Sequence, residues 1–108
     1  MIGVGVIGYG YWGPNLVRNF NEAHSSRVVA VCDLSSRRLA QAQRRYPTVK
    51  ITTDYRELLS DPAIDAIAVA TPVSTHFDLA IQVLRAAKQV LTVDHPFVYM
   101  AQYVRSGN

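Results

Sequence analysis

The chain has 108 residues, 49% of them hydrophobic, which allows one domain with a core but is short for a complete two-domain enzyme. Eleven Lys and Arg against eight Asp and Glu give a formal charge of +3, an excess too small and scattered to indicate a nucleic-acid partner. The single cysteine, Cys32, excludes an internal disulfide, and neither a signal-peptide pattern nor an apolar run of roughly 20 residues is present, so we expect a cytoplasmic protein with no membrane role.

The first predicted unit is a strand, a tight turn and a helix. Val and Ile residues over 2–7 form a short apolar run that ends at a glycine cluster, as expected of a buried strand followed by a turn. A helix is predicted over 14–22, because Leu16 and Phe20 recur at helical spacing and Pro14 suits a first helical position.

Two further pairs of a strand and a helix follow. Residues 28–32 form a second apolar run that Asp33 closes, and residues 35–46 begin with a serine suited to capping a helix. A short third strand is predicted over 49–52. The short helix predicted over 55–60 ends at an Asp-Pro pair, because the residue before a proline disfavours helical backbone.

The last predicted elements are a strand over 64–70, a longer helix over 75–88 with one apolar side, and a strand over 89–93. Apolar strands separated by helices indicate an α/β fold with a doubly wound parallel sheet of about five strands, helices on both faces and the Rossmann-type order 3-2-1-4-5. The strand over 89–93 is then expected to leave an unpaired sheet edge. Pairing of two chains across that edge, giving a homodimer, is a hypothesis that follows.

A glycine motif follows the first strand. Gly8, Gly10 and Gly13 match the spacing GxGxxG, in which the glycines allow a tight turn, close approach of a pyrophosphate and close packing of helix on strand. Asp33 lies 20 residues beyond Gly13, at the end of the next strand, where an acid binds ribose hydroxyls. These features predict a dinucleotide site. The alternative is a plain glycine turn, with Asp33 capping the following helix.

Side chains near the motif bear on which dinucleotide binds. Tyr11 and Trp12 lie within the glycine loop and are predicted cofactor contacts. Asp33 should repel a 2′-phosphate and so favours NAD over NADP. Arg37 and Arg38 follow closely and could hold that phosphate or stack on adenine, although a solvated helix face is the simpler interpretation for at least one of them. We therefore expect NAD, with NADP as the alternative.

A second motif carries a resemblance to a known family. Residues 70–76 read Ala-Thr-Pro-Val-Ser-Thr-His, and together with the glycine loop they resemble the N-terminal halves of the Gfo/Idh/MocA oxidoreductases, whose ATPxxxH segment lies along the cofactor near the nicotinamide. The resemblance covers essentially the whole chain. It implies that Thr71, Pro72 and His76 contact the cofactor; the alternative for His76 is a helix N-terminal residue without a ligand.

A third family motif is altered. Val93-Asp94-His95-Pro96 stands where the family has Val-Glu-Lys-Pro, so the resemblance implies a cofactor contact for Asp94 and a partial replacement of the lysine by His95, whose imidazole can move a proton near neutral pH. The alternative is that 93–99 corresponds to the next strand of the family. The lysine segment would then be missing, and a last helix would follow Tyr99.

The resemblance implies hydride transfer between a nicotinamide cofactor and a sugar, polyol or related substrate in the intact enzyme. Residues 1–108 would be the dinucleotide-binding domain, truncated before a C-terminal substrate domain, so the isolated chain is expected to bind the cofactor without catalysis. The alternative function is a non-catalytic nucleotide-binding module for sensing or assembly. No metal site is predicted, because the candidate acids are spread over separate elements and lack local spacing: Asp61, Asp65, Asp78 and Asp94.

Overall fold

The computed structural model describes residues 1–71, 76–86, 88–94 and 99–103. Strands and helices alternate through most of this chain. In order they are β1 (Ile2–Ile7), α1 (Gly13–Glu22), β2 (Ser26–Cys32), α2 (Ser36–Arg45), β3 (Lys50–Thr52), α3 (Arg56–Ser60), β4 (Ala66–Val69), α4 (His76–Arg85), β5 (Gln89–Asp94) and β6 (Tyr99–Tyr103). No helix among the described residues has the length and apolar character needed to cross a membrane.

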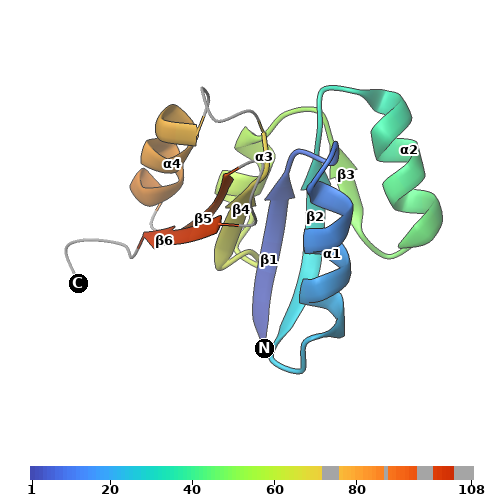
Figure 1. Cartoon of the computed structure of the whole chain (residues 1–108), viewed down its shortest axis with the longest axis horizontal. Coiled ribbons are helices and arrows are strands. Elements are labelled where there is room, and N and C mark those ends of the chain that lie inside the picture. The colour runs from blue at the N-terminus through green and yellow to red at the C-terminus, as the bar shows by residue number, and fades with distance from the viewer. Residues whose placement is uncertain (72–75, 87, 95–98, 104–108) are drawn as a thin grey trace.

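The strands form one sheet in the order β3-β2-β1-β4-β5-β6. All neighbouring pairs from β3 to β5 are parallel. The strand order reverses between β1 and β4, because β2 and β3 lie on one side of β1 whereas β4 and β5 lie on the other. The predicted doubly wound order 3-2-1-4-5 is therefore confirmed. Figure 1 shows this arrangement, with β1 near the middle of the sheet and the N-terminus at its lower end.

The end of the sheet differs from the expectation. β6 pairs antiparallel with β5, with Asp94 opposite Tyr99 and Val90 opposite Tyr103. The alternative alignment, in which 93–99 is the next strand of the family, predicted a helix after Tyr99, and that prediction is wrong because Tyr99–Tyr103 form a strand. The prediction of an unpaired sheet edge at residues 89–93 is also wrong. The physical reason is that an antiparallel neighbour can be reached by a short connection and satisfies backbone groups that the edge would otherwise leave unpaired. The dimerisation hypothesis loses the edge on which it rested.

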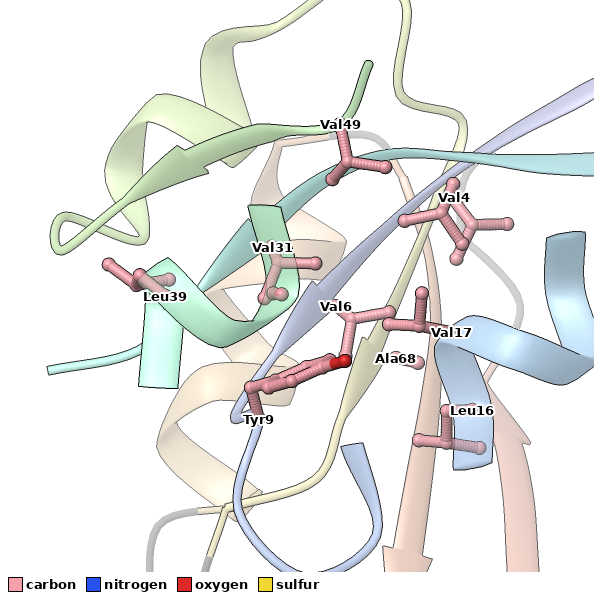
Figure 2. Packing of buried hydrophobic residues seen from close by; sticks show 11 residues of the cluster. Val4, Val6, Tyr9, Leu16, Val17, Val31, Leu39, Val49 and Ala68 are labelled. Carbon is pink, nitrogen blue, oxygen red and sulfur yellow. The ribbon is translucent and has the colours of Figure 1, made fainter. Parts of the chain in front are cut away.

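Helices cover both faces of the sheet (Figure 1). One apolar cluster joins α1 and α2 to the sheet and a second joins α3 and α4 to the opposite face. In the first cluster Val17 of α1 packs near Val6 and Ala68, and the ring of Tyr9 lies beside them, as Figure 2 shows. Tyr9 therefore anchors the start of the glycine loop in the core.

An extra residue in β2 decides which side chains face each helix layer. Val4 of β1 pairs with Val28, but Gly5 pairs with Ala30, so Val29 is inserted between them. Val28 and Val31 consequently both face α1 and α2, whereas Val29 and Ala30 face the other layer. Such a bulge re-aims the residues beyond it.

A buried lysine links two segments at the amino-terminal ends of the parallel strands. α4 ends at Arg85, earlier than predicted, and Lys88 precedes β5 with only 8% of its surface exposed. Its Nζ donates hydrogen bonds to the carbonyl oxygens of Asp61 at 2.9 Å and Ile64 at 2.5 Å. This side chain ties the start of β5 to the loop that leads into β4.

Candidate functional site

A cleft of about 870 Å³ lies at the carboxyl ends of the parallel strands. Open parallel sheets bind ligands at this edge, beside the position where the strand order reverses, which here falls between β1 and β4. The volume is within the range of pockets that hold small molecules and cofactors. The lining residues are Ile7, Gly8, Gly10, Tyr11, Trp12, Cys32, Asp33, Leu34, Arg38, Thr53, Tyr55, Ala70, Thr71, Asp78 and Leu79.

The glycine loop forms one wall of the cleft, and two of its glycines are required by the fold. Gly8 has a φ of 101°, and a Cβ there would lie 2.9 Å from the carbonyl oxygen of Ala70. A Cβ at Gly13 would collide with the carbonyl oxygen of Gly8. These two positions hold the loop close to β4 and to the start of α1.

Gly10 differs, because a Cβ there would meet only the far end of one flexible side chain. The nearest atoms would be Nη1 of Arg38 at 3.1 Å and Cζ at 3.5 Å. Gly10 also lines the cleft. The backbone of the chain therefore does not require glycine at this position, whereas a ligand that approaches the loop closely would.

The positive N-terminal end of α1 adjoins this loop. The first turn holds no acidic residue, and Trp12 at the N-cap makes no side-chain capping hydrogen bond. Backbone amides and the helix dipole at such an end favour an anion. The loop and helix together provide a surface suited to a phosphate group.

Asp33 is held rigidly by two backbone amides. Oδ2 accepts a hydrogen bond from the Tyr9 amide at 2.7 Å, and Oδ1 accepts one from the Ser35 amide at 2.8 Å. Only 9% of Asp33 is exposed, and that surface is part of the cleft. The proposed capping role of Asp33 is wrong, because Ser35 caps α2 by accepting a hydrogen bond from the Arg38 amide at 3.3 Å.

The two arginines of α2 lie in different surroundings. Arg38 lines the cleft, and its Nη1 lies 3.9 Å from Oδ2 of Asp33. Arg37 is exposed and is not among the lining residues. The structure thus separates the two candidates that the sequence left equivalent.

The cleft is also lined by residues that the sequence analysis did not assign to the cofactor site. Thr53 follows β3, Tyr55 precedes α3, and Asp78 lies in the first turn of α4. All three line the cleft, and the Tyr55 hydroxyl donates a hydrogen bond to Oε1 of Gln82 at 2.7 Å, which joins α3 to α4. Their position after a strand or at a helix start on the ligand-binding edge is the signal that could have identified them.

Cys32 lies at the base of the cleft and is not a nucleophile at neutral pH. Burial, and secondarily the negative charge of Asp33, raise the pKa of its thiol to about 11. The thiolate is the reactive form, and it is suppressed here. Cys32 therefore serves packing between β2 and the α3 side of the sheet.

Other predicted site residues lie at the same edge or outside the described residues. Tyr11, Trp12 and Thr71 line the cleft. The backbone of His76 begins α4 and that of Asp94 ends β5. Two more predicted residues, Pro72 and His95, lie outside the described residues, so the roles assigned to them stay predictions.

Metal ions in proteins are held by clusters of His, Cys, Asp or Glu side chains. Within residues 1–71, 76–86, 88–94 and 99–103, no three His, Cys, Asp or Glu side chains come together as metal ligands would. The cleft brings together seven of the predicted site residues: Gly8, Gly10, Tyr11, Trp12, Asp33, Arg38 and Thr71.

Comparison with known proteins gives one consistent result. The family model GFO_IDH_MocA, described as an oxidoreductase family with an NAD-binding Rossmann fold, matches residues 2–105. Inositol 2-dehydrogenase 2 of Paenarthrobacter aurescens strain TC1 is 38% identical over 91 residues, covering 83% of this chain and 27% of that protein. The chain therefore spans about a quarter of the length of this relative.

Two solved structures show the same fold with a dinucleotide. GenD2 from gentamicin A biosynthesis, in complex with NAD, has a TM-score of 0.81 and 29% identity, covering 86% of this chain and 26% of GenD2. Biliverdin reductase from Synechocystis sp. PCC 6803, in complex with biliverdin and NADP+, has a TM-score of 0.80 and 26% identity, covering 86% of this chain and 29% of the reductase.

Proposed function

The chain belongs to the Gfo/Idh/MocA oxidoreductase family as its NAD-binding Rossmann domain, and from this premise we propose that it holds the cofactor for hydride transfer to or from a polyol or related sugar substrate. One observation carries the proposal. The cleft offers an open Gly10 backbone beside the N-terminus of α1 and a rigidly held Asp33, the arrangement that a pyrophosphate and its adjoining ribose require.

The residues present fit a nicotinamide dinucleotide. The amides at the start of α1 would bind the pyrophosphate, which Gly10 admits because it has no Cβ. The Asp33 oxygens keep lone pairs for ribose hydroxyls after accepting the Tyr9 and Ser35 amides. The bound cofactor supplies hydride chemistry, while the protein orients it at the carboxyl edge of the sheet.

The substrate assignment and the division of labour are also proposals. An inositol dehydrogenase among the relatives supports a polyol substrate. Because relatives of this kind are about four times longer, we assign residues 1–108 to cofactor binding and expect a further domain to bind the substrate. Proton transfer by His95 belongs to that complete enzyme. The buried free thiol of Cys32 supports a reducing, cytoplasmic setting.

The single tryptophan offers a direct test. Trp12 lines the cleft, so bound NADH should accept excitation energy from it and give sensitised nicotinamide fluorescence that saturates with concentration. ADP-ribose, which lacks the nicotinamide, should compete with NADH for the cleft and abolish the sensitised fluorescence. Incubation of the chain with myo-inositol and NAD+ should give no NADH. Absence of the sensitised signal would contradict the cofactor site, and turnover by the chain alone would contradict the need for a second domain.

A further inference from the structure

A second hollow, of about 430 Å³, lies at the amino ends of β2 and β3, away from the cofactor cleft. It forms because β3 is shorter than β2. Only Ala30–Cys32 of β2 pair with Lys50–Thr52 of β3, so the first residues of β2 have no strand beside them on that side. The Val28 amide donates instead to Oδ1 of Asn21 at 2.9 Å. Among the described residues, the hollow and the cofactor cleft share no lining residue.

The rim of this hollow carries three cations. Arg27 lies near the start of β2, Arg45 ends α2 and Lys50 begins β3, and all three are exposed. The described residues that line the hollow, which we call the basic pocket, include no acid. The lining also includes the buried side chains of Val28 and Val49. Charges of one sign around a hollow with low-dielectric walls concentrate their field and attract a counter-ion.

The two arginines of the basic pocket keep their charge available. In the described part of the chain, no ion pair joins Arg27 or Arg45 to an acid. Arg45 lies with its Cζ 5.9 Å from the centre of the Tyr46 ring, a contact that orients the guanidinium without neutralising it. Lys50 does have a partner, since its Nζ is 3.3 Å from Oδ2 of Asp61, but its side chain is 68% exposed and such surface ion pairs are weak.

A role in stabilising secondary structure does not account for these cations. Arg44 and Arg45 both lie in the last turn of α2, where a basic side chain offsets the negative end of the helix dipole, yet of the two only Arg45 lines the pocket. Arg27 lies in a strand, which has no comparable dipole. Asn21 adds a neutral donor to the lining. Because its Oδ1 accepts the Val28 amide, its NH₂ group is left to donate.

We propose that the basic pocket binds a small polyanion, a molecule that carries a phosphate or pyrophosphate group. Each guanidinium fork binds phosphate oxygens in pairs, and Arg27 and Arg45 come from different elements, as a group with several oxygens requires. The volume lies within the range of pockets that hold small molecules. The proposal does not rest on the proposed function, because the pocket is separate from the cofactor cleft.

Titration of the isotope-labelled full chain with inorganic pyrophosphate, followed by NMR, tests the proposal by position. The side-chain amide of Asn21 and the backbone amides of Arg27 and Thr48 should shift and saturate, with a dissociation constant of about 1 mM or tighter. Gly8 and Gly10 report the cofactor cleft separately. Inorganic phosphate and glycerol phosphate, titrated in the same way, show whether the free anion or an ester binds more tightly.

Substitutions separate a specific pocket from general attraction by the net positive charge. Arg27→Gln and Arg45→Gln should each weaken pyrophosphate binding by at least about fivefold. Arg44→Gln is the matched control, because it removes the same charge from the same turn of α2 at a residue that does not line the pocket. It should change the affinity by less than about twofold. Unchanged dispersion of the NMR signals confirms that each variant is folded.

Three results would each overturn the proposal: shifts that do not saturate, shifts confined to Gly8 and Gly10, or equal weakening by Arg44→Gln and Arg45→Gln. Tighter binding of a hexaglutamate peptide than of pyrophosphate would assign the pocket to an acidic protein segment and would overturn it as well. Saturable shifts at Asn21 in a chain that binds no NADH would support this proposal and contradict the proposed function.

Discussion

At Gly10 a Cβ would meet the tip of the Arg38 side chain, whereas at Gly13 it would meet the backbone carbonyl of Gly8. A flexible side chain moves aside at little cost, but a backbone carbonyl in a loop fixed by hydrogen bonds cannot. Gly8 is held in this way, since its amide donates to the carbonyl of Cys32 at 2.7 Å. The two glycines therefore serve different purposes in the same motif.

This difference predicts that alanine substitutions at the two positions change the free energy of unfolding by different amounts. Gly10→Ala should change the free energy of unfolding by less than about 0.5 kcal/mol, because only Arg38 has to move. Gly13→Ala should cost about 2–3 kcal/mol, because the new methyl group forces the backbone apart. Urea unfolding followed by circular dichroism measures both. Equal losses in the two variants would contradict the assignment of separate roles.

Cys32 predicts how stability depends on alkaline pH. Because its pKa rises from 9.0 to about 11 in the folded chain, the unfolded chain releases the thiol proton first as the pH increases. The resulting contribution to the free energy of unfolding is complete below about pH 9 and is lost as the pH rises toward 11, a total loss of at most about 3 kcal/mol. Unfolding of the wild type and of Cys32→Ala should be compared over this range. Parallel pH profiles for the two proteins would show that the thiol does not contribute.

Single residues of the site were predictable to different degrees. The spacing from Gly13 to Asp33 predicted a carboxylate at the cleft, and the structure places it there. The choice between Arg37 and Arg38 was not predictable, because neighbouring residues on a helix differ in direction by a rotation that only the packing of α2 fixes. Tyr55 was missed for a similar reason, since its place beside α4 depends on a contact 27 residues away.

At the scale of elements, Lys88 links two segments at the amino end of the sheet. Lys88→Met would leave the carbonyls of Asp61 and Ile64 without this donor, and we expect a loss of about 2–4 kcal/mol. Lys50→Met is the matched control, because Lys50 contacts Oδ2 of Asp61 at 3.3 Å from an exposed position and should cost at most about 1 kcal/mol.

Chemical denaturation measures the free energy of unfolding of both variants, and titration with NADH measures their affinity for the cofactor. Because Lys88 lies at the end of the sheet opposite the cleft, its replacement should leave the affinity for NADH unchanged at temperatures where the variant is folded. A loss for Lys50→Met as large as that for Lys88→Met would show that burial of the lysine is not what gives it its effect.

The elements divide by how far local sequence determines them. Apolar runs of four or more residues predicted β1, β2 and β4, and a glycine motif at the end of β1 predicted the start of α1. β6 was not predicted as a strand of this sheet, because the periodicity of apolar residues does not determine which strand pairs with β5. The inserted residue in β2 was equally invisible, since it exists only relative to β1.

In the whole molecule, the Lys88 hydrogen bonds that stabilise the fold and the residues that line the cleft lie at opposite ends of the sheet. The Lys88 hydrogen bonds lie at the amino ends of the strands, while the glycine loop, Asp33 and Arg38 lie at the carboxyl ends. The core clusters between them bind the two helix layers to the sheet independently of any ligand. We therefore expect the chain to fold without its cofactor and to form the site before the cofactor arrives.

The measurement that tests the central claim most directly is calorimetric titration of the chain with NADH, repeated with Gly10→Ala. We predict saturable binding of NADH to the wild type. Gly10→Ala should keep the fold but lose at least about tenfold in affinity, because the new Cβ occupies the space through which the pyrophosphate approaches the loop. Equal affinities in the two proteins, or no binding to the folded wild type, would contradict the assignment of this cleft as the dinucleotide site.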